Sequence, residues 1–301
     1  MSQREALQHT IRNPVTLRGA GVHTGVMATL TLRPAPAGTG LVFRRIDLEP
    51  GRQAIPALID HVTATAFATS LDNGLGASVQ TSEHLLAACV GLGLDNAFLD
   101  LDGPEAPILD GSAEAFCRAI DEAGLSPQTA ERSYIRILRT VTVQAGEAWA
   151  RFEPREPLGL ELSVEIDFDC AAIGRQVFSR VVSPDVFRSD IAFARTFARS
   201  KDLTTLSAAG LAKGASMKNG VLFDGDRVCN PEGLRADDEC VRHKALDVVG
   251  DLALLGAPVW GRYVANRPGH TINALALRAL CEQPDAFELT LAKTALAADA
   301  A

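Results

Sequence analysis

Several features that mark common protein classes are missing from this sequence. No two of its six cysteines form a C-x-x-C pair, which excludes the usual thiolate zinc sites and dithiol redox motifs. No apolar run is long enough to cross a bilayer, and Met1–Glu5 carries no apolar signal core. We therefore expect a cytoplasmic protein without stable membrane insertion, whose thiols stay reduced.

An excess of basic residues is missing as well. The chain has 29 lysine and arginine residues against 37 aspartate and glutamate residues, a net charge of −8, and only 5% of its residues are aromatic. Nucleic-acid-binding domains usually gather basic and aromatic side chains on one face. We therefore expect no nucleic-acid partner, and a negatively charged substrate would have to be bound by a few well-placed cations.

What is present indicates a globular α+β protein. With 301 residues, of which 47% are hydrophobic, the chain can bury two cores of ordinary size. Alternating or β-rich runs predict strands at residues 26–32, 41–45, 97–101 and 158–168. Helical periodicity begins at Ser82, a plausible cap, and returns at 237–255 and 271–280. In each half the strands come first, which favours α+β units over an alternating parallel sheet.

The polar stretch 124–133 contains Ser126-Pro127 and is the best candidate for a domain boundary. We accordingly expect an N-terminal α+β domain at 1–127 and a C-terminal α+β domain at 128–301. The order of elements repeats between the halves, but the residues do not.

The most informative segment is His243-Lys244-Ala245-Leu246-Asp247. Residues four apart on a helix lie on one face, so His243 and Asp247 can present an imidazole and a carboxylate to one metal ion. His84 is the natural third ligand, and the neighbouring Glu83 can act as a base on water. Two histidines and one carboxylate leave a coordination position open, as in catalytic zinc sites. The pattern therefore predicts a hydrolase.

Each of these residues also has an ordinary interpretation. An isolated histidine is usually a hydrogen-bonded core or surface residue, Asp247 could be a solvated helix residue, and Glu83 could simply favour the dipole at a helix start. The same ligand set would also bind Fe²⁺, so the residues alone do not select zinc.

A series of longer blocks is more specific than any one motif. In order, they are Gly21-Val22-His23-Thr24-Gly25, residues 31–36, Phe43-Arg44-Arg45, residues 82–88, residues 102–112, Ala194-Arg195-Thr196-Phe197, residues 243–247 with Gly250-Asp251, and Gly269-His270. Together they resemble the UDP-3-O-acyl-N-acetylglucosamine deacetylases, the zinc amidases of lipid A biosynthesis. The resemblance runs from about residue 15 to about residue 290.

The resemblance implies a reaction and a fold. The reaction is hydrolysis of the acetamide of UDP-3-O-(3-hydroxyacyl)-N-acetylglucosamine to the free amine and acetate, the committed step of lipid A biosynthesis in Gram-negative-type bacteria. The cofactor would be Zn²⁺, with Fe²⁺ as the alternative in the cell. The fold would be two similar domains, each a helix layer on a mainly antiparallel sheet, with helices packed face to face and the metal site at the domain junction. We expect a monomer that acts on this small-molecule acylated UDP-sugar.

The resemblance also implies roles for the catalytic residues beside the three metal ligands. Glu83 would be the general base, and His270 would be the acid that protonates the leaving amine. Asp251 would hold the imidazole of His270 in its protonated form. Lys244 and the hydroxyl of Thr196 would donate hydrogen bonds to the oxyanion.

Substrate binding is implied for a further group of residues. An insert at about 198–225 would shape a passage for the acyl chain, although core packing is the ordinary interpretation of its apolar residues. The candidates are Phe197, Leu203, Leu206, Leu211 and Met217, with Arg267 for the UDP phosphates. Arg267 stands at a family lysine position and changes the reach of that charge. Ala198-Arg199 and Gly214-Ala215-Ser216 also depart from the common family form, so acyl-chain preference does not carry over.

Two family blocks have no expected part in the chemistry. His23 is expected to serve a tight turn or a supporting hydrogen bond, and Asp110-Gly111-Ser112 is expected to cap the helix that follows.

Two other functions compete with this interpretation. One is a zinc amidohydrolase that acts on another N-acetylated sugar, and the other is a non-catalytic, nucleic-acid-binding α+β protein. Deacetylase assays on the UDP-sugar with and without its 3-O-acyl group would distinguish the first alternative from the family reaction. The acidic charge balance argues against the second.

Overall fold

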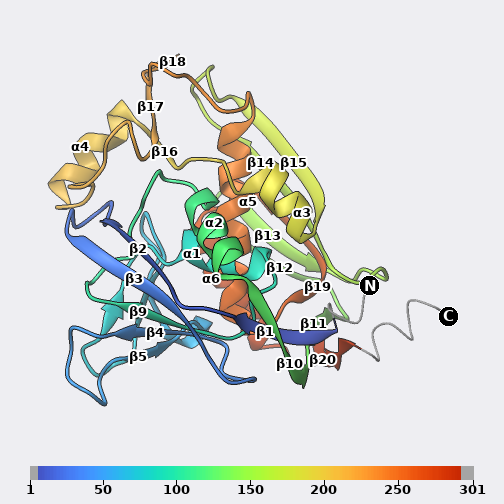
Figure 1. Ribbon diagram of the computed structural model, residues 1–301. Coiled ribbons are helices and arrows are strands. Elements are labelled where there is room, and N and C mark those ends of the chain that lie inside the picture. Colours follow the sequence, from blue (N-terminus) through green and yellow to red (C-terminus); the bar gives the residue numbers. More distant parts are fainter. Residues whose placement is uncertain (1–5, 293–301) are drawn as a thin grey trace.

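Two sheets enclose a central group of helices (Figure 1). The computed structural model describes residues 6–292. Among these residues, no helix is both long and apolar enough to cross a membrane.

The N-terminal sheet has five strands in the order β2-β3-β9-β4-β5. Their bounds are β2 (Val15–Ala20), β3 (Met27–Pro34), β4 (Leu41–Arg45), β5 (Ala54–Pro56) and β9 (Ala97–Leu101). The central pair β4 and β9 is parallel and the other pairs are antiparallel. Helix α1 (Glu83–Gly91) precedes β9, and helix α2 (Glu114–Ala123) follows it.

The C-terminal sheet repeats this plan. Its strands are β12 (Val141–Ala145), β13 (Ala148–Glu153), β14 (Leu160–Asp167), β15 (Arg175–Val182) and β19 (Val259–Asn266). These five of the sheet's seven strands lie in the order β12-β13-β19-β14-β15, and among these five only the central pair β14 and β19 is parallel. Helix α5 (Glu239–Leu252), continued by the 3-10 turn Ala253–Leu255, precedes β19, and helix α6 (His270–Cys281) follows it. Strand β11 (Ser133–Ile137) pairs in parallel with the start of β19, and β20 (Phe287–Leu291) pairs with β11.

Strand order, strand direction and helix placement therefore match between the two units. The α+β class and the repetition of architecture predicted from the sequence are confirmed, and most predicted strands and helices lie within a few residues of the observed ones.

The polar stretch 124–133 is not a loop. Most of it forms β10 (Leu125–Glu131), which pairs antiparallel with β1 (Leu7–Ile11) in a separate two-stranded sheet. Proline is tolerated in such a ribbon because an edge strand has backbone groups that need no partner, so Pro127 did not break the strand. The domain division after residue 127 stays a prediction, and that residue lies inside β10.

Each unit carries an insert after the fourth of its five strands along the chain, between β5 and α1 in the first unit and between β15 and α5 in the second. The first contains the 3-10 turn Ile59–His61 and the strands β6 (Val62–Ala64), β7 (Ser70–Asp72) and β8 (Ser78–Val79). The second contains α3 (Pro184–Val186), the π-helical turn Phe187–Ile191, β16 (Phe197–Arg199), α4 (Ser200–Ala208), β17 (Val221–Asp224) and β18 (Arg227–Val228). Figure 1 shows α4 and β17 at one side of the molecule, away from the C-terminal sheet.

The two units meet where α1 packs against α5. A Cβ atom added to Gly250 on α5 would overlap the carbonyl oxygen of Glu83, so the two backbones are in contact there. Ser82 occupies the cap position of α1, but its hydroxyl donates to the carbonyl of Thr69 (3.1 Å) and the helix has no side-chain cap. This contact brings the first turn of α1 to the face of α5 that carries His243.

Candidate metal centre

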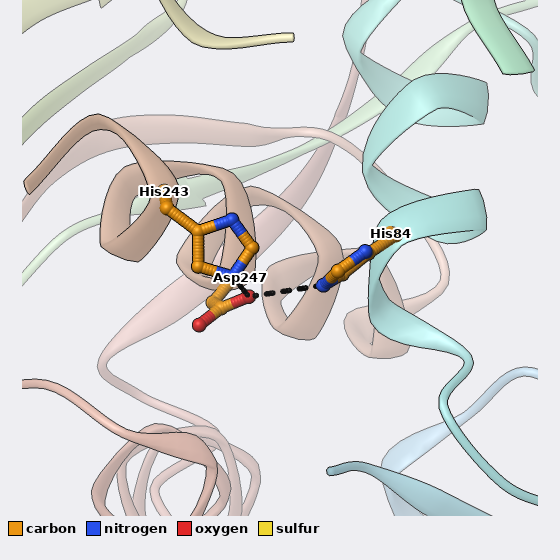
Figure 2. A group of neighbouring side chains, drawn as sticks. All are labelled: His84, His243 and Asp247. Carbon is orange, nitrogen blue, oxygen red and sulfur yellow. Dashed lines mark ion pairs between the residues drawn. The ribbon is translucent and has the colours of Figure 1, made fainter. Parts of the chain in front are cut away.

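The three predicted metal ligands lie together. His84 is on α1, while His243 and Asp247 lie one turn apart on α5 (Figure 2). Oδ1 of Asp247 is 3.3 Å from Nε2 of His243 and 3.7 Å from Nε2 of His84. All three side chains are buried, and their ligand atoms lie within 4.8 Å of one another.

Their hydrogen bonds leave the metal-facing atoms free. Nδ1 of His243 lies 3.1 Å from the carbonyl oxygen of Ala194 and donates to it, which leaves a lone pair on Nε2. Oδ2 of Asp247 accepts from Nζ of Lys244 (2.8 Å), whereas Oδ1 has no hydrogen-bond partner among the described residues. A buried carboxylate oxygen without a partner is costly, so a cation at this point would satisfy it.

The charge states also suit a cation. Burial, together with the nearby His243, lowers the pKa of His84 to about 3. Burial likewise lowers the pKa of His243. For Asp247, burial acts to raise the pKa, but His243 and Lys244 hold it below its usual range. At neutral pH the set therefore offers two neutral imidazoles and one carboxylate, the forms that bind zinc.

Glu83 and His270 face each other beside this cluster. Oε1 of Glu83 lies 3.8 Å from Nε2 of His270. Burial raises the pKa of Glu83 to about 7, with the neighbouring Asp247 and Asp251 adding to the effect. Burial acts to lower the pKa of His270, but Asp251 and Glu83 raise it to about 10. The pair therefore offers a carboxylate that titrates near neutrality and an imidazole that keeps its proton there.

A buried hydrogen-bond network stands behind this pair. Oδ2 of Asp251 accepts from Nδ1 of His270 (2.9 Å) and from Nδ2 of Asn273 (2.7 Å), and its Oδ1 accepts from the hydroxyl of Thr69 (2.7 Å). The backbone N–H of Thr69 donates to Oε2 of Glu83 (3.1 Å). The hydroxyl of Tyr263 lies 3.0 Å from Oδ1 of Asn273 and donates to it.

Three residues of this network were not foreseen: Thr69, Asn273 and Tyr263. They are uncharged and come from the first insert, α6 and β19, and no local pattern distinguishes them from ordinary core residues. Only the packing of the elements identifies their role.

A cavity of about 550 Å³ opens onto the cluster. The predicted residues that line it are Glu83, His84, Thr196, Phe197, His243, Lys244, Asp247, Arg267 and His270. The ammonium of Lys244 lies 5.6 Å from the centre of the Phe197 ring. Leu203, Leu206, Leu211 and Met217 do not line this cavity; Leu206 is buried and Met217 is exposed. Their contact with an acyl chain stays a prediction.

Arg267 has carboxylate partners of its own. Its guanidinium pairs with Asp167 (3.0 Å) and with Glu147. Arg267 also borders a second hollow, of about 340 Å³, lined as well by Ile166, Asp167, Phe168, Asp169, Arg199 and Pro268. Its charge is therefore largely balanced before any phosphate arrives.

The loop of residues 21–25 is a tight turn, in which the N–H of Gly25 donates to the carbonyl of Gly21 (3.0 Å). The buried carboxylate of Glu105 holds it by accepting from the N–H groups of His23 (2.9 Å) and Thr24 (2.7 Å). The turn expected for His23 is confirmed. No role was predicted from the sequence for Glu105, whose carboxylate fixes this turn through the two hydrogen bonds.

The Asp110-Gly111-Ser112 block contacts the C-terminal unit. The hydroxyl of Ser112 accepts from the N–H of Glu114 (3.2 Å) at the start of α2. In addition, the carbonyl of Gly111 accepts from the N–H of Thr196 (2.8 Å). The expected side-chain cap is absent, because the cap position of α2 is Ala113 and the helix has no side-chain cap. Ser112 instead bonds the N–H of the first residue of α2, and Gly111 holds the segment that carries Thr196.

Known proteins are similar in sequence to this chain along nearly its whole length. The sequence model of the family described as UDP-3-O-acyl N-acetylglycosamine deacetylase matches residues 8–282. A UDP-3-O-acyl-N-acetylglucosamine deacetylase of Phenylobacterium zucineum is 46% identical over 282 residues, which cover 94% of this chain and 96% of that protein. The proteins of the same name from Brucella ovis and Brucella canis are 46% identical over 285 residues, which cover 94% of this chain and 98% of theirs.

Proposed function

Because the chain belongs to the UDP-3-O-acyl-N-acetylglucosamine deacetylase family, we propose that the cluster of His84, His243 and Asp247 is the centre of its active site. The chain is a hydrolase that removes the acetyl group of a UDP-3-O-acyl-N-acetylglucosamine in lipid A biosynthesis. The observation that carries the site is the buried, unpartnered Oδ1 of Asp247 between two imidazole nitrogens.

His84, His243 and Asp247 would hold one divalent cation, which we assign as Zn²⁺ because two imidazoles and a carboxylate suit it. Fe²⁺ would fit the same atoms. When bound, the cation supplies Lewis-acid polarisation of the acetamide carbonyl and a lowered pKa for water. The hydrogen bond from His243 to Ala194 and the one from Lys244 to Asp247 keep two of the three ligands oriented.

Glu83 would take a proton from the attacking water, since its pKa of about 7 leaves it able to accept one near neutrality. His270 would then give its proton to the amine nitrogen as the C–N bond breaks. Asp251 supports this role because its hydrogen bond to Nδ1 fixes the ring and favours the imidazolium. Lys244 and Thr196 line the same cavity and would donate to the oxygen on which negative charge develops.

The substrate would enter the cavity beside Phe197 and Arg267. Phe197 would contact the acyl chain, and Arg267 would meet a phosphate by exchanging one of its carboxylate partners. We place the distal acyl chain against Leu203, Leu206, Leu211 and Met217 of the second insert. The enzyme would work as a cytoplasmic monomer, with residues 1–127 and 128–301 as its two domains.

Metal analysis paired with a deacetylase assay tests the site. Glu83→Ala should keep its metal and lose activity by about 10²- to 10⁴-fold, the usual contribution of a general base. His243→Ala should lose both metal and activity. His61→Ala is the matched control and should change neither, because the imidazole of His61 bonds to the carbonyl of Asp72 (3.0 Å), which is not part of the metal cluster. Full turnover by Glu83→Ala would refute the base assignment.

The substrate is tested in the same assay. Activity on the UDP-sugar should depend on the 3-O-acyl group. Equal rates with and without that group would favour an amidohydrolase for another N-acetylated sugar.

A further inference from the structure

One peptide unit joins the candidate ligand His243 to a buried ion pair. The carbonyl of Ala194 accepts from Nδ1 of His243 (3.1 Å). The N–H of Arg195, which belongs to the same peptide unit, donates to Oε1 of Glu239 (3.0 Å). A trans peptide is planar, with its N–H and C=O pointing in opposite directions, so the two groups cannot turn independently.

Both partners of this peptide unit lie on one helix. Glu239 is the first residue of α5, and His243 follows four residues later on the same face. Glu239 therefore accepts the N–H of the Ala194–Arg195 peptide unit. The carbonyl of the same unit accepts from the imidazole of His243, one turn further along α5. Two hydrogen bonds through one peptide unit thus connect the imidazole of His243 with the carboxylate of Glu239.

Arg195 fixes that carboxylate. Its Nε donates to Oε1 of Glu239 (2.8 Å) and its Nη2 to Oε2 (3.1 Å), which is the two-pronged geometry that suits a guanidinium. The same guanidinium reaches Oε1 of Glu232 (2.8 Å) and the carbonyl of Gly233 (2.8 Å). Oε2 of Glu239 also accepts the backbone N–H of Arg235 (2.7 Å). Arg195 is 3% exposed and Glu239 is 0% exposed, so water does not compete for the bonds between these two residues.

The flanking residues are fixed from the other unit. The N–H of Thr196 donates to the carbonyl of Gly111 (2.8 Å), and the N–H of Ala113 donates to the carbonyl of Ala192 (2.9 Å). The segment 192–196 is therefore held by hydrogen bonds on both sides of the peptide that meets His243.

Stability alone is a weak reason for such a pair. Desolvation of two charges offsets much of their attraction, and well-packed apolar residues often serve a core as well or better. A buried pair does, however, fix directions that apolar contacts leave free. Here the Arg195–Glu239 pair fixes the direction of the Ala194 carbonyl, which faces His243.

We propose that Arg195 and Glu239 are positioning residues for the metal centre. Through the Ala194–Arg195 peptide they hold the imidazole of His243 in the tautomer and orientation that leave Nε2 facing the metal. The inference rests on the proposed metal site. Residues that orient a metal ligand typically change metal affinity by about 10- to 100-fold when altered.

The test measures metal binding by the full chain. Arg195→Lys keeps the charge but loses the two-pronged contact. Zn²⁺ affinity is measured by competition with a chelator, and the Co²⁺-substituted protein gives an absorption spectrum that reports ligand geometry. We expect Arg195→Lys to bind Zn²⁺ about 10- to 100-fold more weakly and to shift the Co²⁺ bands.

Arg132→Lys is the matched control. Arg132 is also largely buried and bonds Asp95 (2.7 Å) and the carbonyl of Gly93 (2.6 Å), which are not part of the metal cluster. The Arg132→Lys variant should have a lower unfolding temperature than the unsubstituted chain, but the same Zn²⁺ affinity and the same Co²⁺ spectrum. Glu239→Gln, which keeps the side-chain shape but loses its charge, provides the same test if Arg195→Lys fails to fold.

The outcomes separate this inference from the proposed metal site. Failure of the unsubstituted chain to bind Zn²⁺ or Co²⁺ would overturn the metal site and, with it, the role of Arg195. Metal binding by the unsubstituted chain, together with unchanged affinity and spectrum in Arg195→Lys and Glu239→Gln, would show that the pair only stabilises the fold.

Discussion

At the scale of single residues, the site combines groups whose environments push their pKa values in opposite directions. Glu83 and His270 lie 3.8 Å apart, yet the carboxyl titrates near neutrality and the imidazole keeps its proton well above it. Burial dominates for Glu83, whereas the Asp251 and Glu83 carboxylates outweigh burial for His270. Such divergence is typical of an acid and a base that work in one reaction, which supports the roles proposed for the two residues.

These pKa values predict a bell-shaped dependence of kcat/KM on pH. Below about pH 7 Glu83 is protonated and cannot accept a proton, and above about pH 10 His270 is neutral and cannot donate one. A bound cation favours the ionised form of Glu83, so the acidic limb of the metal-loaded enzyme should lie below pH 7. Measurement of kcat/KM from pH 5 to 11, in roughly half-unit steps, checks the profile. An unchanged acidic limb in Glu83→Gln would contradict the assignment of that limb to Glu83.

Thr69 gives a second prediction at this scale. Thr69→Val keeps the side-chain shape but removes the hydroxyl donor to Oδ1 of Asp251, which leaves a buried acceptor without its partner. We expect a loss of about 1–3 kcal/mol in the free energy of unfolding. We also expect kcat to fall with little change in KM, because Asp251 orients His270 and Thr69 is not among the residues lining the cavity.

Urea unfolding and steady-state kinetics measure both effects of Thr69→Val. Thr69→Ser keeps the hydroxyl and should restore most of the kcat. If kcat of Thr69→Ser is as low as that of Thr69→Val, loss of the hydroxyl does not explain the lower kcat.

Residues differ in how far the sequence alone could predict them. His243 and Asp247 lie one helical turn apart, so their shared face was predictable from spacing. His84, from the other unit, was predicted as the natural third ligand beside Glu83, but no spacing rule places it near the other two. Thr69 lies in the first insert, Asn273 in α6 and Tyr263 in β19, and no spacing rule connects them. Their network exists only because α5, α6 and the first insert pack together.

At the scale of elements, the contact between α1 and α5 determines whether the ligands can meet. Gly250 has no side chain, and the backbone of α5 therefore lies directly on the first turn of α1. The positions of β3, β4, β9 and β14 and of α1, α5 and α6 were predictable because apolar periodicity follows the sheet faces and helix faces. The strand β10 was not, because its polar composition and proline are typical of a loop, and only pairing with β1 makes it a strand.

Gly250→Ala should force α5 away from α1, because the added Cβ would overlap the carbonyl oxygen of Glu83. Overpacking of this kind costs about 1–3 kcal/mol in unfolding free energy. It should also weaken Zn²⁺ binding, since His84 and the two ligands on α5 move apart. Chelator competition and thermal unfolding measure the two effects.

Gly269→Ala is the control for Gly250→Ala, because a Cβ at residue 269 has no atom within 4 Å and the residue does not have a positive φ. It should leave metal affinity unchanged. Equal metal affinity in Gly250→Ala and the unsubstituted chain would show that the helix contact does not set the ligand geometry.

At the scale of the whole molecule, the fold repeats one plan, in which five strands are combined with two helices. In both units the first helix precedes the central strand and faces the other unit, so α1 and α5 become partners across the junction. Repetition of element order was visible in the sequence. Strand order within each sheet was not, because it depends on long-range pairing such as that of β4 with β9 and of β14 with β19.

A metal bound between α1 and α5 would also link the two units, so its removal should lower the stability of the whole molecule. Binding to the folded state alone stabilises it by about 4 kcal/mol when the free metal is a thousand times its dissociation constant. We therefore expect a chelator to lower the unfolding temperature of the unsubstituted chain and to leave that of His84→Ala unchanged, because this variant has already lost a ligand from α1. His61→Ala should respond to the chelator as the unsubstituted chain does. If metal analysis shows that the unsubstituted chain binds metal and loses it to the chelator, yet its unfolding temperature does not change, the metal does not couple the units. The packing of α1 on α5 and the hydrogen bonds of residues 192–196 to the N-terminal unit then hold the junction without it.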